Sequence, residues 1–235
     1  MPDPLQLSRF LDGARNLLPA AVSLRRRIHA KPELGLNLPL TTAAVLDGLR
    51  GLEVEIARGP STSGLVVSLI GTKPGSQSGR TILLRGDMDA LPMPEETGLH
   101  YASEFKGRMH ACGHDAHTAM LVQAVHLLHR HKDQLAGTVK FMFQPGEEGY
   151  AGARLMIADG LLDADPKPDA AFALHIWPSV KAGAIMLLTP SCKFRLALAS
   201  RAGEMQIHVR FTEDCTINCS QERNAKAVRS QVEDP

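Results

Sequence analysis

Short apolar runs without polar alternation are the feature of this sequence that most restricts its fold. The runs are Leu65–Ile70, Thr81–Arg85, Gly137–Phe143 and Ala170–Ile176, with a shorter one at Val54–Ile56. A strand that is apolar on both faces belongs in a sheet that is covered on both sides. Segments with helical spacing separate the runs. We therefore predict an α/β fold with a largely buried sheet.

The helical segments show apolar spacing and residues that begin or end helices. Leu5–Leu17 and Ala20–His29 have helical spacing, and Pro19 predicts a break between them. Thr41 and Thr42 are expected to cap the next helix. Two more helices are predicted over Gly113–His131 and Ala151–Asp159.

Length and charge narrow the class of protein. The 235 residues suffice for one large or two small domains with a core. Lys and Arg number 26 against 25 Asp and Glu, so we expect no nucleic-acid or membrane partner, since both need clustered positive charge. We see neither a signal peptide nor an apolar stretch approaching the ~20 residues of a bilayer span. We expect a cytoplasmic globular enzyme or small-molecule binder with reduced cysteines.

Side chains with metal-binding chemistry follow the predicted strands or open the helix after them. In an α/β sheet, functional groups gather at the carboxyl ends of the strands. Thiolate, imidazole and carboxylate groups are the usual ligands of zinc and neighbouring divalent metals. The residues concerned are Asp87, Asp89, Cys112, His114, Asp115, His117, Glu147, Glu148 and His175.

The spacing of these residues suggests how they could divide the work. Cys112 and His114 flank a glycine, so a tight loop could turn both toward one ion. One of the adjacent Glu147 and Glu148 can bind metal while the other acts as general base on metal-activated water. A spare carboxylate such as Asp89 can orient a ligand.

Each of these residues also has an ordinary structural explanation. His175 could be a packed residue at the end of a buried strand, and Cys112 a small buried side chain. Paired glutamates usually form a solvated surface. Asp115 could be an acid at a helix N-terminus, or a further carboxylate that orients a ligand. Their recurrence at four strand or helix ends of one chain favours a functional site.

Five stretches resemble one family of hydrolases. They are RRRIHAKPELGL, RGDMDALPMPEETG, MHACGHDAHTAML, GTVKFMFQPGEEGYAGA and ALHIWP, and they cover about residues 20 to 190 in consistent order. The sequence is similar to metal-dependent amidohydrolases that include hippurate hydrolases, N-acyl-amino-acid amidohydrolases and indoleacetyl-amino-acid hydrolases. These enzymes are related to aminoacylases and exopeptidases. HACGHD together with EEG is a highly specific combination.

The resemblance implies a fold, a reaction and residue roles. The fold would be a mixed sheet sandwiched by helices, as in zinc exopeptidases, with an inserted lid domain through which the family tends to homodimerise. The reaction would be hydrolysis of the amide bond of small N-acyl-amino acids. Glu147 would be the general base, and Asp87 and Asp89 would shape the site from behind the ligands. The ligands of a divalent-metal pair (Mn, Zn or Co) would include Cys112, His114, Glu148 and His175.

The end of the chain departs from the family pattern. Residues 192–235 contain only Gly203 and Pro235 of the chain's glycines and prolines, but three of its four cysteines, Cys192, Cys215 and Cys219. Glu204 stands where the lid domain of the family would carry a histidine. We therefore predict that residues 1–190 are the N-terminal part of the catalytic domain and that 191–235 are an atypical tail in place of the lid. This pattern fits a truncated, mis-spliced or frame-shifted product.

Two other hypotheses compete with an active amidohydrolase. The first is an inactive or weakly active metal-binding fragment of such an enzyme. The second is a thiol hydrolase in which Cys112 is the nucleophile and His114 or His117 the base. The second hypothesis leaves both glutamates and His175 without a role.

Overall fold

The computed structural model describes residues 4–76, 79–180 and 184. The predicted tail, with Cys192, Glu204, Cys215 and Cys219, lies outside the described residues. The helices of the described part are α1 (Pro4–His29), α2 (Pro39–Gly48), α3 (His114–His129) and α4 (Gly152–Ala158). Its strands are β1 (Glu55–Arg58), β2 (Leu65–Ile70), β3 (Arg80–Asp87), β4 (Gly137–Gln144) and β5 (Ala170–Ala173).

The strands form one mixed sheet in the order β1-β2-β4-β3-β5. β1 pairs with β2 and β2 with β4 in antiparallel fashion, whereas β3 runs parallel to both β4 and β5. Asp87 lies beside Gln144 at the last register position of β3 and β4. The carboxyl ends of β3, β4 and β5 therefore meet at one edge of the sheet. This arrangement confirms the predicted α/β class and the mixed sheet.

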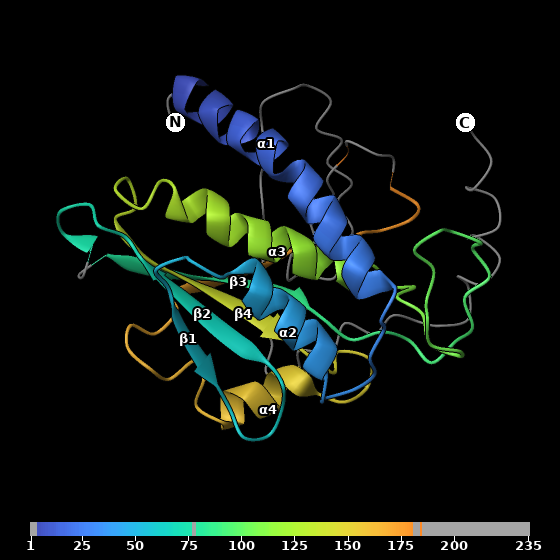
Figure 1. The fold of residues 1–235 in the computed structure, drawn as a ribbon. Coiled ribbons are helices and arrows are strands. Elements are labelled where there is room, and N and C mark those ends of the chain that lie inside the picture. Colours follow the sequence, from blue (N-terminus) through green and yellow to red (C-terminus); the bar gives the residue numbers. More distant parts are fainter. Residues whose placement is uncertain (1–3, 77–78, 181–183, 185–235) are drawn as a thin grey trace.

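Helices cover both faces of this sheet, with α1, α2 and α3 on one side and α4 on the other (Figure 1). Successive side chains of β2 alternate between two clusters: Val67 packs with the α1 to α3 side, and Val66 with Met156 of α4. β4 does the same with Phe141 and Met142, and all its residues are buried. Burial on both faces explains why these strands are apolar without alternation.

The first helix is continuous where the sequence predicted a break. α1 has 26 residues and contains Pro19. An interior proline costs a helix about 3 kcal/mol because it removes a hydrogen bond and clashes with the preceding turn. Leu17, Leu24 and Ile28 are buried on either side of it. Each buried aliphatic side chain contributes about 1.5–3 kcal/mol, which together outweighs the local cost.

The predicted threonine cap of α2 is also wrong. Thr41 and Thr42 lie inside the helix, which begins at Pro39. The carboxylate of Glu33 accepts hydrogen bonds from the backbone N–H groups of Leu40 (3.1 Å) and Thr41 (2.8 Å). A buried side chain from the preceding loop therefore satisfies the free N–H groups of the first turn.

The remaining boundaries differ from the sequence predictions by a few residues. β2 was predicted correctly, whereas β1 begins and ends later than Val54–Ile56. β5 ends at Ala173 instead of continuing to Ile176. Beyond the strand, the backbone N–H of Ile176 donates to the ring of His117.

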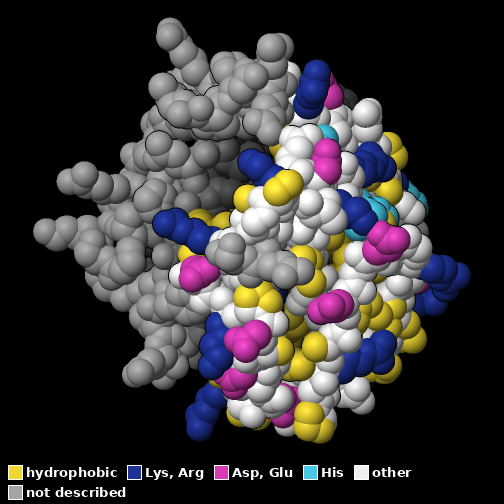
Figure 2. Space-filling view, turned by 90° about the vertical axis from the view of Figure 1, so that its left-hand side faces the viewer, with side chains coloured by type: hydrophobic (Ala, Val, Ile, Leu, Met, Phe, Trp, Pro, Cys, Tyr) yellow, Lys and Arg dark blue, Asp and Glu magenta, His cyan; other side chains and the backbone are white. Residues whose placement is uncertain are grey.

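The surface shows no segregation of charge on the face seen in Figure 2, where dark blue and magenta side chains are interspersed over the described residues. Within the described part of the chain, no helix combines the length and apolarity needed to cross a membrane.

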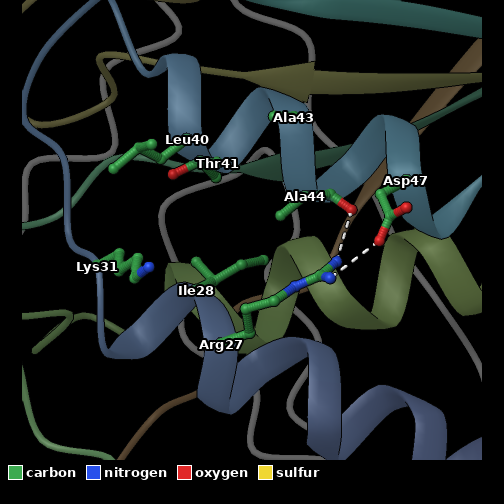
Figure 3. Close-up of a pocket in the computed structure, with 8 residues that line it drawn as sticks. All are labelled: Arg27, Ile28, Lys31, Leu40, Thr41, Ala43, Ala44 and Asp47. Carbon is green, nitrogen blue, oxygen red and sulfur yellow. Dashed lines mark hydrogen bonds and ion pairs between the residues drawn. The ribbon is translucent and has the colours of Figure 1, made fainter.

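A hollow of about 240 Å³ lies between the end of α1 and α2 (Figure 3). Arg27 closes one side of it by bonding Asp47 (2.9 Å) and the carbonyl of Ala44 (3.1 Å). None of the predicted site residues lines this hollow. It is therefore separate from the candidate site.

A buried histidine joins the end of α1 to the rest of the molecule. His29 Nδ1 lies 2.7 Å from Asp115 Oδ2, and Nε2 lies 3.1 Å from Glu95 Oε1. A neutral imidazole has one N–H, so donating to both carboxylates requires the protonated ring. Burial opposes protonation, but the hydrogen bonds and charges of Asp115 and Glu95 raise the pKa of His29.

Replacing His29 by Gln is expected to lower the free energy of unfolding by about 1–3 kcal/mol, because two buried carboxylates lose a charged donor. Since the pKa of His29 is raised on folding, its contribution is full below its ordinary pKa of about 6.5 and disappears as pH rises through the folded value. Urea denaturation at several pH values should therefore show that the difference in free energy of unfolding between wild type and His29→Gln decreases as pH rises. The exposed His100, changed to Gln, is the control. A difference in free energy of unfolding that increases with pH would contradict the assignment of His29 as a protonated donor.

Candidate metal centre

The candidate side chains converge where the three parallel strands end. Asp87 is the last residue of β3, Glu147 follows β4 by three positions, and His175 follows β5 by two. α3 begins at His114. Among the described residues, three sets of side chains bring their ligand atoms within 4.8 Å of one another: Cys112 with His114 and His175, Asp87 with His114 and His117, and His114 with Glu147 and Glu148.

A left-handed glycine places Cys112 and His114 in the same site. Gly113 precedes α3 with φ +89°. L side chains rarely adopt this conformation, and a Cβ here would also approach Ile176 Cβ at 3.4 Å. The tight loop predicted from the spacing of the motif is therefore present, and it depends on glycine.

Two buried atoms at this place lack a hydrogen-bond partner among the described residues. His114 Nδ1 lies 2.7 Å from the backbone carbonyl of Asp89, so Nδ1 carries a proton and Nε2 is the ring nitrogen left to bind another partner. Nε2 has no partner, and neither does Glu148 Oε1, 4.0 Å away. Leaving such atoms unpaired costs about 1–3 kcal/mol each. A divalent cation between them would satisfy both, so the residues fit a metal.

The charges around His114 also favour a cation. Burial by itself lowers the pKa of this imidazole, but Asp89, Cys112 and the charge of Asp87 raise it to about 11. The metal-free ring is therefore a cation, and its surroundings stabilise positive charge at Nε2. A bound divalent ion would replace the proton there.

Glu147 lies in a buried and negatively charged environment. Burial, followed by the charges of Asp87 and Glu148, raises the pKa of the Glu147 carboxyl to about 7. The neighbouring Asp87 behaves in the opposite way: burial opposes its ionisation, but Arg85 and the hydrogen bond from His117 hold its pKa well below the ordinary range. The site thus contains one carboxyl group with a raised pKa, Glu147, and one with a lowered pKa, Asp87.

Cys112 and His175 form the second side of the site. Cys112 Sγ lies 3.4 Å from His175 Nε2. His175 Nδ1 lies 2.6 Å from the carbonyl of Ile176, so Nδ1 carries the proton and Nε2 is free to accept. Burial lowers the pKa of His175 and keeps the ring neutral. The thiol-hydrolase hypothesis had considered His114 and His117 as bases, and the structure adds His175 as a contact of the thiol.

Asp89 holds two parts of the site together. Its side chain is buried, with Oδ1 accepting from the backbone N–H of Glu147 (2.9 Å) and Oδ2 from that of Glu148 (3.0 Å). Its backbone carbonyl accepts from His114, as described above. One residue therefore positions the glutamate loop and the imidazole relative to each other.

Sequence reasoning missed the partners of Asp87. Asp87 Oδ1 lies 2.6 Å from His117 Nδ1, and Oδ2 lies 2.6 Å from Arg85 Nη1. Arg85 Nε also donates to Gln144 Oε1 at 2.7 Å. Arg85 and Gln144 are polar residues near the ends of apolar strands. This position in the sequence could have indicated that they belong to the site.

Asp115 lies on the other side of the helix N-terminus. Its carboxylate bonds His29 and Arg25 of α1 and the N–H of Ala116. It therefore fastens the first turn of α3 to α1. His110, another buried residue of the same motif, has no hydrogen-bond partner at either ring nitrogen among the described residues, and burial lowers its pKa to about 4.

The three sets of ligand atoms share one residue. His114 belongs to every set but offers one free nitrogen, Nε2. His117 has both ring nitrogens occupied, by Asp87 and by the N–H of Ile176. The three sets are therefore overlapping parts of one site around His114.

We expect isothermal titration of the chain with Zn²⁺ to show a tightly bound ion whose binding depends on His114. His114→Ala should lose this binding, because His114 is common to all three sets. His100→Ala, which removes an exposed imidazole outside the site, should keep it. Unchanged Zn²⁺ binding by His114→Ala would contradict the assignment.

Comparison with known proteins places the chain among metallopeptidases. Residues 83–234 match peptidase family M20/M25/M40. The chain is 42% identical over 164 residues to thermostable carboxypeptidase 1 of Saccharolobus solfataricus, covering 69% of this chain and 40% of that protein. It is 41% identical over 168 residues to the N-acetyl-L-cysteine deacetylase of Bacillus subtilis, covering 72% and 39%.

A solved structure agrees with this placement. The Bacillus subtilis YXEP protein, described as a dinuclear metal binding peptidase from the M20 family, matches with a TM-score of 0.64 and 35% identity, covering 74% of this chain and 48% of that one. The chain spans about two fifths to one half of the length of these three proteins.

Proposed function

The chain belongs to peptidase family M20/M25/M40, and on this premise we propose metal-dependent hydrolysis of the amide bond of N-acyl-amino acids as its function. The observation that carries the proposal is a pair of buried atoms, His114 Nε2 and Glu148 Oε1, which lie 4.0 Å apart at the carboxyl ends of the strands and have no hydrogen-bond partner among the described residues. The N-acetyl-L-cysteine deacetylase among the relatives supports the substrate class.

The proposed ligands are those that the family resemblance implied: Cys112, His114, Glu148 and His175. They offer a thiolate, two imidazole nitrogens and a carboxylate, a donor set that accommodates Zn²⁺ and Co²⁺ and also Mn²⁺. The family resemblance implies a second ion, as in the dinuclear relative. The chemistry that such ions supply is Lewis acidity, which polarises a carbonyl group and makes water more acidic.

Glu147 is the proposed general base. It lies beside Glu148 but outside the proposed ligand set. Its backbone N–H donates to Asp89 Oδ1 at 2.9 Å. The carboxylate of Glu147 accepts a proton from the attacking water and delivers it to the nitrogen of the leaving amine. The amide C–N bond breaks, and the oxygen of water remains in the released carboxylic acid. Asp89 keeps the base next to His114 throughout, because it bonds both.

The adjacent glutamates provide a matched test of these roles. Glu147→Gln is expected to lower kcat by about 10²–10⁴-fold while the Zn²⁺ affinity changes little, since it removes a proton acceptor and no ligand. Glu148→Gln is expected to weaken Zn²⁺ binding, because a carboxylate ligand is lost. Turnover of N-acetylated amino acids and calorimetric metal titration measure the two effects. If Glu147→Gln loses the metal and Glu148→Gln keeps it, the roles are reversed.

A metal-binding fragment without turnover is the second candidate function. Such binding needs only the ligand atoms that the described residues bring together around His114. The chain loaded with Mn²⁺, Zn²⁺ or Co²⁺ is to be assayed on N-acetyl-, N-benzoyl- and indoleacetyl-amino acids. Hydrolysis of any of them supports the enzyme, and binding of one ion without hydrolysis supports the fragment.

A substitution of Cys112 can distinguish a thiol mechanism from a metal-dependent one. The sulfur of Cys112 lies 3.4 Å from His175. Cys112→Asp removes the thiol nucleophile but retains an anionic metal ligand. We expect this variant to bind Zn²⁺ and to keep chelator-sensitive turnover. Complete loss of turnover with intact Zn²⁺ binding would instead support the thiol mechanism.

The domain boundary stays part of the proposal. We assign residues 1–190 to the catalytic domain and 191–235 to the tail, although the family match continues to residue 234. The homodimer implied by the family resemblance would form through a lid domain.

A further inference from the structure

His117 is buried one turn after His114 on α3, and its ring is held at both nitrogens. Nδ1 lies 2.6 Å from Asp87 Oδ1, and Nε2 accepts the backbone N–H of Ile176 at 2.9 Å. A backbone N–H can only donate, so Nε2 must carry a lone pair and Nδ1 the proton. This arrangement requires one neutral tautomer of His117. It leaves no nitrogen free for a metal.

The N–H that His117 accepts belongs to the residue after a proposed ligand. His175 lies beyond the end of β5, outside the hydrogen bonds of the sheet, and is half-buried. Its own Nδ1–H donates to the carbonyl of Ile176. Ile176 is thus held from both sides, its N–H by His117 and its carbonyl by the ring of His175. The rings of His117 and His175 lie 4.7 Å apart between centroids.

We propose that His117 is a positioning residue that sets the place of the His175 ligand by holding the N–H of Ile176. The link runs from Arg85 and Asp87, through His117, to the segment that carries His175. It fixes His175 Nε2 beside Cys112 Sγ, at 3.4 Å. The inference rests on the proposed metal-dependent function. It also means that Asp87, His114 and His117 are not a second metal site, although their ligand atoms lie close together.

Wild-type protein provides the first test, through the ¹⁵N resonances of its histidine rings. We expect His117 to show the neutral tautomer protonated at Nδ1, both before and after one equivalent of Zn²⁺ is added. His114 and His175 should instead change at Nε2 on addition of Zn²⁺. A metal-induced change at His117 Nε2, or protonation at that nitrogen, would overturn the proposal. This measurement needs no variant, so it does not depend on whether a substitution folds.

Two substitutions separate the two hydrogen bonds of His117. The side-chain amide of Asn reaches the place of Nδ1 and can still donate to Asp87, but it cannot accept from Ile176. The amide of Gln reaches the place of Nε2 and can accept from Ile176. We expect His117→Asn to weaken Co²⁺ binding by about 10–100-fold, the usual effect of losing an outer partner of a metal site. His117→Gln should stay within about threefold of wild type.

The coupling to His175 is tested in a double-mutant cycle. If His117 acts through His175, then His117→Asn should have almost no further effect on Co²⁺ affinity in a His175→Ala background. The visible absorption of bound Co²⁺ should change similarly in His117→Asn and His175→Ala, because both disturb the same ligand. Circular dichroism of the metal-free proteins identifies variants that fail to fold.

The outcomes distinguish this inference from its premise. Absence of Co²⁺ binding by the wild type would overturn the proposed metal-dependent function and this inference with it. Normal wild-type binding, combined with additive effects of His117→Asn and His175→Ala, would overturn the positioning role alone. Loss of affinity in His117→Gln but not in His117→Asn would show that the bond to Asp87 matters instead, which also contradicts the proposal.

Discussion

The hydrogen bonds of Asp89 are the interactions on which the arrangement of the site depends. A buried carboxylate is costly unless it is fully bonded, and Asp89 meets this requirement with the backbone N–H groups of Glu147 and Glu148. The carbonyl of the same residue bonds His114 and leaves Nε2 of that ring free. The position of the proposed base, the carboxylate ligand and one imidazole ligand are therefore consequences of one residue after β3.

Three histidines of the site have different roles because their second nitrogens have different partners. His114 and His175 both donate from Nδ1 to a backbone carbonyl, which leaves Nε2 of each ring as the nitrogen that can bind a metal. His117 donates from Nδ1 to Asp87, but its Nε2 already accepts a backbone N–H. The partner of one ring nitrogen fixes the tautomer and hence what the other nitrogen can bind.

The same buried region connects the metal centre to the first helix. Asp115 directly follows His114, and it bonds His29 and Arg25 of α1. A histidine that donates to two carboxylates, Asp115 and Glu95, fastens α1 to the first turn of α3. Sequence reasoning did not assign a role to His29, since nothing in its spacing along the chain indicates partners that lie 66 and 86 residues away.

Local sequence was sufficient for the buried sheet and for the grouping of candidate ligands. Apolar runs without alternation indicate strands covered on both faces, and parallel strands must present their following residues at one edge. Gly113 between Cys112 and His114 likewise indicated a tight turn, because few other residues adopt its conformation.

Where local preference and long-range contacts compete, the sequence predictions were wrong. Pro19 did not end α1, because burial of the surrounding leucines outweighs a local defect. The cap of α2 came from Glu33 and not from Thr41 or Thr42. β5 ended at Ala173, and the backbone N–H of Ile176 bonds His117. Spacing along the chain encodes the local preference of each residue, but which partner takes a hydrogen bond depends on groups that meet only in the folded molecule.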